Sequence, residues 1–237
     1  MPVVWKERHI LTPKGWARVV HLQGHDPEEI FKLVQTRGDR LSGHPPVTLY
    51  RHGTTSLVFR PRTEDFNPSK QFKVLQRMVE KRQASVEMPF ALVEHPDHYG
   101  LLSYAKKGVS KRSMLANVIN DNALSMQERW SMAKAGMRRL AEIHAVGFNH
   151  GHPYGNLMVD ANNRVKFIDS SLVSEFDSTL AEGELEGLAS ALTERLWVAR
   201  PWEERIKLNH KVEMFRIQKR LLEEYNRTLE KRSKKKL

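Results

Sequence analysis

Length, composition and charge narrow the class of this protein. The chain has 237 residues, of which 40% are hydrophobic and 28% charged, enough to bury a core in one domain or two small lobes. It contains no cysteine, so disulfides and thiolate metal sites are excluded, while histidine or carboxylate metal sites stay open. No apolar run approaches the roughly 20 residues that cross a bilayer. The start, MPVVWKERHI, is too short and too charged for a signal peptide, so we expect a soluble, cytoplasmic protein.

The net charge is strongly positive. It is +11 at pH 7, with an isoelectric point near 9.9, which favours polyanionic partners such as nucleic acid, phospholipid headgroups or nucleotide. Five of the positive charges lie in the last seven residues, Lys231–Leu237, and the rest of the chain keeps a net charge of +6. This basic tail fits both a solvated, frayed end and an arm that contacts a partner.

The N-terminal part of the chain is mainly strand-like. Residues 1–29 hold two short β-like runs around a turn at Pro13–Gly15, and their role is not evident from the sequence. Asp26 to Glu29 has the cap, the proline and the acidic first turn of a helix start, but it also fits a loop leading into a strand at Ile30–Gln35. The runs that predict strands are Val3–Trp5, Ala17–Leu22, Val47–Arg51, Ser56–Arg60, Phe90–Val93 and Tyr99–Tyr104.

Helical patterns are rare before residue 105 and dominate after it. Asn67 caps a segment whose apolar residues repeat at helical spacing to about Arg82. Lys106–Gly108 then resembles a linker, and Ser125 with Glu128 forms a capping box at the start of a later helix. The helical segments after the linker are Met114–Ile119, Ser125–His144, Leu180–Ala199 and a long, charged segment, Trp202–Lys231.

A β-hairpin interrupts the helical part. Its strands are the apolar runs Leu157–Val159 and Val165–Ile168, joined by a turn at Asp160–Asn163. Asn156 leads into the first strand and Asp169 leaves the second, so antiparallel pairing brings these two side chains to the same end of the hairpin. A hard divalent cation that carries phosphates needs such oxygen ligands.

The hairpin and the loop before it carry a family resemblance. The segments IHAVGFNHGHPYGNLMVD and VKFIDSS resemble the helix-end histidine, the catalytic loop and the metal-binding strand of the protein-kinase-like superfamily, specifically its small atypical branch. That branch includes the RIO kinases, the small kinase of the tRNA-modifying KEOPS complex, and bacterial lipopolysaccharide-core kinases. The resemblance implies an α+β, two-lobed kinase-like fold. Its parts are an N-terminal extension (1–29), a β-rich N-lobe with one helix (30–105), a mainly helical C-lobe (106–230) and a basic tail (231–237).

The resemblance also implies ATP and Mg²⁺ as cofactors. Asn156 matches the loop asparagine that binds a metal ion, and Asp169 matches the aspartate that bridges Mg²⁺ to the nucleotide phosphates. The catalytic aspartate of the family is missing. Its position is occupied by His152, or by Gly151 if the loop is aligned without a gap. A neutral imidazole can accept a proton near pH 7, so His152 is a candidate catalytic residue with Asp169; the alternative is that it only shapes the loop.

The phosphate-binding residues of the family are altered as well. Arg60 stands where the family has a strand lysine, and Gln71 stands near the helix glutamate that pairs with it. Gly38 and Gly43 are the nearest equivalent of the glycine-rich loop. These four are the candidate nucleotide-binding residues. Other alignments place Lys32, Arg62, Glu64 or Glu80 in the two charged roles.

Three hypotheses follow from a site that keeps its metal ligands and loses four other features. The chain is an atypical phosphotransferase or ATPase, a pseudokinase that binds nucleotide and a protein partner, or an RNA-associated factor of the KEOPS type that uses its basic surface and tail. An aromatic and basic set near the C-terminus fits either a nucleic-acid patch or the core of a helical lobe. Its members are Arg195, Trp197, Arg200, Trp202, Arg205 and Phe215.

Overall fold

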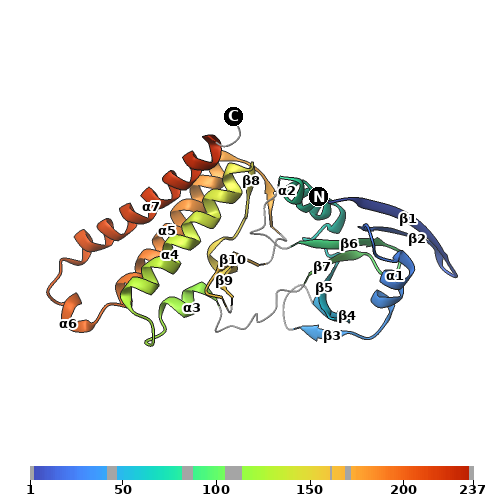
Figure 1. Ribbon diagram of the computed structural model, residues 1–237, viewed down its shortest axis with the longest axis horizontal. Helices are drawn as coiled ribbons and strands as arrows, with labels where there is room; N and C mark the ends of the chain where they lie inside the picture. The colour runs from blue at the N-terminus through green and yellow to red at the C-terminus, as the bar shows by residue number, and fades with distance from the viewer. Residues whose placement is uncertain are drawn as a thin grey trace. The chain divides into compact units, whose positions relative to one another are not determined.

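The structure is a computed structural model that describes residues 3–41, 47–81, 88–104, 114–160, 162–168 and 172–234. The chain divides into two compact units, Met1–Lys107 and Gly108–Leu237. The first is built around a β-sheet and the second around long helices (Figure 1). This is the α+β composition that the sequence predicts. The linker predicted at Lys106–Gly108 lies outside the described residues.

The first unit contains one antiparallel sheet of seven strands in the order β1-β2-β6-β7-β5-β4-β3. Every predicted strand run overlaps one of its strands, although the run predicted at Val3–Trp5 shares only Trp5 with β1, and β3 has no predicted counterpart. The two strands from residues 1–29 pair with each other and, through β2, with β6. The strands are β1 (Trp5–Thr12), β2 (Gly15–Leu22), β3 (Asp39–Leu41), β4 (Val47–His52), β5 (Thr55–Pro61), β6 (Pro89–Glu94) and β7 (Gly100–Tyr104).

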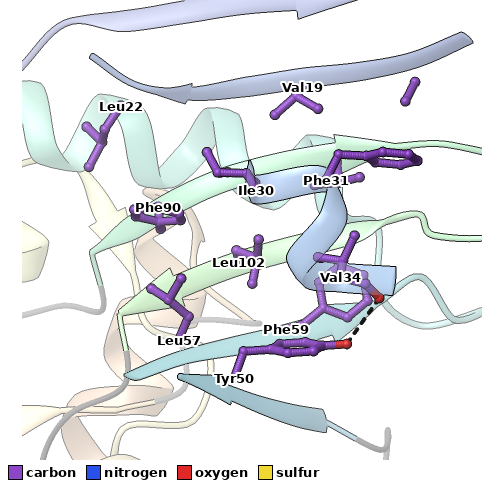
Figure 2. Close-up of a cluster of buried hydrophobic side chains, with 13 residues drawn as sticks. Val19, Leu22, Ile30, Phe31, Val34, Tyr50, Leu57, Phe59, Phe90 and Leu102 are labelled. Carbon is purple, nitrogen blue, oxygen red and sulfur yellow. Dashed lines mark hydrogen bonds between the residues drawn. The ribbon is translucent and has the colours of Figure 1, made fainter. Parts of the chain in front are cut away.

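A short helix, α1 (Pro27–Gln35), covers one face of this sheet. The helix interpretation of Asp26–Glu29 is confirmed and the strand alternative is wrong. The Asp26 carboxylate accepts a hydrogen bond from the backbone N–H of Glu28 at 2.9 Å and caps the helix. Ile30, Phe31 and Val34 pack into a buried cluster with strand residues, and the Tyr50 hydroxyl donates to the Val34 carbonyl at 3.2 Å (Figure 2).

A second helix, α2 (Pro68–Glu80), covers the other face. Val20, Leu92 and Leu101 are cross-strand neighbours that are buried and take no part in the cluster under α1. Since side chains alternate between the faces of a strand, these three lie on the face opposite α1, where α2 contacts β6 and β7. The Asn67 side chain accepts from the backbone N–H of Lys70 and starts α2 as predicted. The first unit is therefore a three-layer α/β/α structure.

The second unit is a bundle of α4, α5 and α7 with the predicted hairpin beside it. The capping box of Ser125 and Glu128 is present at the start of α4. The predicted Trp202–Lys231 segment is two helices, because the Asn209 side chain accepts from the backbone N–H of Val212 and starts a new one. The elements are α3 (Leu115–Ile119), α4 (Met126–Ala145), β8 (Phe148–Asn149), β9 (Leu157–Val159), β10 (Val165–Phe167), β11 (Ser174–Glu175), α5 (Ser178–Val198), α6 (Trp202–Arg205) and α7 (His210–Lys234).

The helices were compared with the length and hydropathy that a bilayer requires. Within the described ranges, none is both long enough and apolar enough to cross one.

Packing of α1 on the sheet gives a stability prediction. Ile30 is fully buried between α1 and the strands, so Ile30→Ala is expected to lower the free energy of unfolding by about 2–5 kcal/mol. The matched control is Glu29→Ala, an exposed position on the same helix, which is expected to change it by less than about 0.5 kcal/mol. Urea denaturation followed by circular dichroism measures both. Equal stability of the two variants would contradict the packing of α1.

Candidate functional site

The predicted hairpin is present, and a hydrogen bond joins the residue before its first strand to the residue after its second strand. Leu157 pairs with Phe167 in β9 and β10, and the N–H of Ile168 donates to the carbonyl of Asn156 at 2.8 Å. Asn156 therefore stands beside the residue that precedes Asp169 in the sequence. Asp169 itself, with Ser170 and Ser171, lies outside the described residues.

Asp160 organises the turn of the hairpin. Its carboxylate accepts from the backbone N–H groups of Asn162 (2.9 Å) and Arg164 (3.0 Å) and pairs with Lys166 Nζ at 2.6 Å. Asn163 adopts a left-handed conformation, with φ of 57°, as a tight turn requires. The hydrogen bond and charge of Lys166, helped by the two amides, lower the pKa of Asp160 to about 2. The Asp160 carboxylate is thus ionised and its contacts stabilise the turn.

Position 151 cannot accommodate the aspartate that the family has in its catalytic loop. Its φ is +86°, a conformation that residues with side chains rarely adopt. A Cβ at this position would lie 2.5 Å from Cβ of Leu172 and 2.7 Å from its carbonyl oxygen. The loop therefore requires glycine at 151, and the alignment that places the catalytic position there leaves no room for a side chain.

His152 has the accessible side chain of this loop. It is exposed and, with Pro153 and Tyr154, borders a hollow of about 400 Å³ whose other wall is α5. Its ring lies against Gly155, where a Cβ would come within 2.5 Å of Nε2. No hydrogen bond engages the His152 side chain among the residues that the structure describes, so the ring is available to a ligand.

The loop is held in place by Glu184 of α5. Its carboxylate accepts from the backbone N–H of His150 at 3.1 Å and from that of Gly151. The same carboxylate lies 2.8 Å from Nε2 of His144, whose Nδ1 lies 2.6 Å from the hydroxyl of Tyr225 on α7. Since a carboxylate only accepts, Nε2 carries the proton, and in the neutral ring Nδ1 accepts from Tyr225. We call these five groups, the Glu184 carboxylate, the His144 ring, the Tyr225 hydroxyl and the two loop amides, the Glu184 network.

The Glu184 network is buried, which sets its electrostatics. Burial by itself raises the pKa of Glu184, but hydrogen bonds from His144 and from the two loop amides outweigh it and lower the pKa below its ordinary value. Burial together with the negative charge of Glu184 raises the pKa of Tyr225 to about 12. The network thus contains a carboxylate that is ionised and a phenol that is neutral throughout the physiological range.

Sequence reasoning identified His144 by resemblance and missed Glu184 and Tyr225. A signal for Glu184 is present in the sequence. It falls on the helical stripe of Ala181, Leu188 and Leu192, all buried, and a carboxylate on an apolar stripe needs buried hydrogen-bond donors. Nothing local predicts that these donors are loop amides more than thirty residues earlier.

His150, at the start of the loop, has a packing role. Its ring is fully buried and stacks on Phe167 of β10, with ring centroids 4.2 Å apart and an interplanar angle of 28°. Tyr154 is tied to α5 through its hydroxyl, which accepts from Nε of Arg195 at 3.2 Å. Together with the Glu184 network, these contacts fix both ends of the loop that leads to Asn156.

The predicted nucleotide-binding residues lie in the first unit. Arg60 is on β5 in register with Leu101 of β7, and Gln71 is buried in the first turn of α2. A Cβ on Gly38 would lie 2.5 Å from Thr48 Cγ2, so close packing against β4 already requires glycine there. Gly43 lies outside the described residues. In the described ranges, no group of three His, Asp or Glu side chains is placed to hold a metal ion.

Comparison with known proteins gives no match in sequence and clear matches in structure. No protein-family model matches the chain, and no curated protein does. WaaP, solved in complex with acyl carrier protein, has 13% identity and a TM-score of 0.54 over 86% of this chain and 94% of that chain. The Cydia pomonella granulovirus kinase PK-1 has 15% identity and a TM-score of 0.54 over 79% of this chain and 77% of that chain.

The chain has a protein-kinase-like fold. This confirms the fold that the sequence resemblance implies. In such folds a strand supplies the phosphate-binding lysine and the next helix supplies its glutamate partner; in this kinase-like chain β5 carries Arg60 and α2 carries Gln71. A shared fold does not specify an activity, so the residues of the site have to be argued individually.

Neutralising Glu184 gives a prediction with a defined pH dependence. Glu184→Gln removes a charged acceptor from three buried donors, and we expect the free energy of unfolding at pH 7 to fall by about 1.5–3 kcal/mol or more. Because the folded-state pKa of Glu184 is lowered, its charge stabilises the fold above the ordinary value of 4.5, and this contribution is lost as the pH falls further. The gap between wild type and variant should therefore narrow below pH 4.5.

The matched control is Glu182→Gln, which is exposed on the same helix and should leave stability unchanged. Urea denaturation between pH 3 and pH 8 measures the three proteins. A gap that does not depend on pH would contradict the assigned role of the Glu184 charge.

Restoring an aspartate to the loop separates its two candidate positions. Gly151→Asp is expected to cost at least about 2 kcal/mol of stability, because the conformation is strained and Leu172 occupies the space. His152→Asp, at an exposed neighbouring position, is expected to be nearly neutral. Thermal denaturation measures both, and a stable Gly151→Asp variant would contradict the geometry of the loop.

Proposed function

We propose that this kinase-like protein binds ATP with Mg²⁺ and transfers the terminal phosphoryl group slowly, to an acceptor hydroxyl or to water. The observation that carries the proposal is the joined hairpin end, where the carbonyl of Asn156 accepts from the N–H of Ile168. In kinase-like folds the metal ligands come from the position of Asn156 and from that of the residue after Ile168 in the sequence, Asp169, so this bond supports their assignment. The Glu184 network supports it, because it fixes the loop leading to Asn156.

The proposed metal ligands are Asn156 and Asp169. Within the described part of the chain no hydrogen bond engages the Asn156 side chain, so its amide oxygen is available to a cation. An amide and a carboxylate oxygen suit Mg²⁺, which prefers oxygen ligands and keeps several waters and phosphate oxygens in its shell. When bound, the ion neutralises charge that develops on the transferring phosphoryl group.

The proposed phosphate contacts are Arg60, Gly38 and Gly43, with Gln71 in place of the helix glutamate. Arginine is always charged and can hold phosphate oxygens with two parallel hydrogen bonds, so it keeps the attraction of the family lysine in a different geometry. Glutamine cannot form an ion pair with it. We therefore expect nucleotide to bind more weakly than at a site with the lysine and glutamate pair.

His152 is the proposed group near the acceptor. A neutral imidazole accepts a proton, which is the chemistry that an acceptor hydroxyl or water needs as it attacks phosphorus. Unlike the family aspartate, it brings no negative charge to the metal site. This difference is the reason for proposing slow turnover.

Nucleotide binding is tested by thermal stability. We expect Mg·ATP at a hundredfold excess over its Kd to raise the midpoint of unfolding by about 5 °C or more. Asn156→Ala and Asp169→Ala should each abolish most of that shift, because each removes a metal ligand. The control is Asn162→Ala, an exposed asparagine in the turn of the same hairpin, which should keep it. No shift in wild type would exclude the nucleotide from this site.

Catalysis is tested separately, by release of inorganic phosphate and by autophosphorylation. We expect low activity in wild type and an increase of about tenfold or more in His152→Asp, because the carboxylate both accepts a proton and brings the negative charge that the imidazole does not supply to the metal site. Asp169→Ala should abolish both activities. Binding of Mg·ATP without turnover in wild type or in His152→Asp would favour the alternative, a pseudokinase that acts as a binding module for a protein partner.

A further inference from the structure

One end of the helical bundle exposes five large apolar side chains in a short part of the chain. Between 44% and 67% of their surface is accessible to solvent. Single exposed apolar residues are ordinary, whereas several on adjoining elements mark an interaction surface. We call this set the α6 patch; its members are Val198, Trp202, Ile206, Val212 and Phe215.

The local structure accounts for this exposure. Trp202 and Ile206 lie one helical turn apart, joined by the hydrogen bond from the N–H of Ile206 to the carbonyl of Trp202 at 3.1 Å. On α7, Glu213 and Ile217 face the bundle and are buried, which turns Phe215 outward. Figure 1 shows α6 at the end of the bundle, beside the start of α7.

The burial of the aromatic residues decides between the two interpretations of the sequence. Trp197 is buried, and the centroid of its ring lies 5.0 Å from that of the His210 ring, so the core interpretation is confirmed for this residue. For Trp202 and Phe215 the core interpretation is wrong. Both side chains are more than half exposed.

Basic side chains surround the patch. Residues 198–220 contain seven Lys or Arg and three Glu. One of the glutamates, Glu213, is buried and pairs with Arg200 at 3.3 Å and Arg216 at 2.6 Å, so it does not present a free negative charge. The exposed basic residues are Lys207, Lys211, Arg216, Lys219 and Arg220. The other two glutamates, Glu203 and Glu204, are exposed next to Trp202, so the five exposed basic residues leave the segment around the apolar side chains with a net positive charge.

We propose that the α6 patch docks on the surface of an anionic lipid bilayer. Tryptophan and phenylalanine partition into the interfacial region, aliphatic side chains enter the acyl boundary, and lysine and arginine attract acidic headgroups. The patch supplies all three kinds of residue within residues 198–220. Since no helix of the described residues could span a membrane, the contact is peripheral.

Charge complementarity alone also fits RNA, and the apolar members decide against it. RNA needs open aromatic faces on which bases stack. Three of the five members are aliphatic, and the Arg205 guanidinium already lies over the Trp202 ring, 5.4 Å from its centroid. Valine and isoleucine gain nothing from a phosphate backbone, whereas at a bilayer they lose contact with water.

Vesicle flotation tests the proposal with the full chain. The probes are vesicles of phosphatidylcholine alone and vesicles that also contain phosphatidylglycerol. We expect binding to the anionic vesicles only, weaker at high salt. The double variant Trp202→Ala/Phe215→Ala should bind them about tenfold to a hundredfold less tightly, because two partly inserted aromatic side chains are lost.

The matched control is Trp16→Ala in the other unit, where the tryptophan is 62% exposed, close to the 64% of Trp202. This control should bind as wild type does. Circular dichroism checks that all proteins are folded, and Mg·ATP binding should be unchanged, which keeps the test independent of the proposed function.

Three outcomes would overturn the proposal. The first is that wild type fails to bind anionic vesicles at low salt. The second is that the double variant binds as tightly as wild type, which would assign the affinity to charge elsewhere, such as the tail at 231–237. The third is that wild type binds single-stranded RNA more tightly than anionic vesicles and loses this binding in the double variant, which would assign the α6 patch to nucleic acid.

Discussion

The hydrogen-bonding requirement of one buried carboxylate organises the helical unit. Glu184 on α5 is ionised and buried, which is tolerable only if the lone pairs that face the interior have donors. The donors are a ring nitrogen from α4 and two amides from the loop after β8. Moving any of these elements would strand a charge in the interior. The loop therefore keeps one conformation without a hydrophobic core of its own. Its position in turn fixes that of Asn156 and of the hairpin that follows.

Much of the fold follows from local signals in the sequence. The strand runs, the asparagine and aspartate caps of α2 and α1, and the capping box of α4 all depend on neighbours a few residues away. The order of strands does not. That β2 lies beside β6, with most of the N-terminal unit between them in sequence, depends on which apolar faces two helices cover, and no short window contains that information. Likewise, one polar residue, Asn209, divides the long helical pattern at the C-terminus.

The candidate site likewise combines features that the sequence predicts with features that it does not. Asn156 is placed by a hairpin whose two apolar runs and polar turn are visible in the sequence, and the structure confirms that hairpin. Glu184 could be suspected from its place on an apolar stripe, but its partners could not, since the chain approaches it with backbone groups that every residue possesses. The glycine at 151 is similar: its need for a positive φ and for the space taken by Leu172 appears only once the loop is folded. Whether Gly151 or His152 corresponds to the catalytic aspartate therefore depends on the space available in the folded loop as well as on the alignment.

The bond between His144 and Tyr225 has a consequence for how the chain acquires its structure during synthesis. All seven strands of the first unit lie within the first 104 residues, so this sheet can assemble while the ribosome is still making the rest. The helical unit has no such option. His144 meets Tyr225 across 81 residues, and α7 packs along both α4 and α5, so the interior of the unit stays open until α7 has emerged. The emergence of α7, rather than that of α4 or α5, is then the event that completes the Glu184 network.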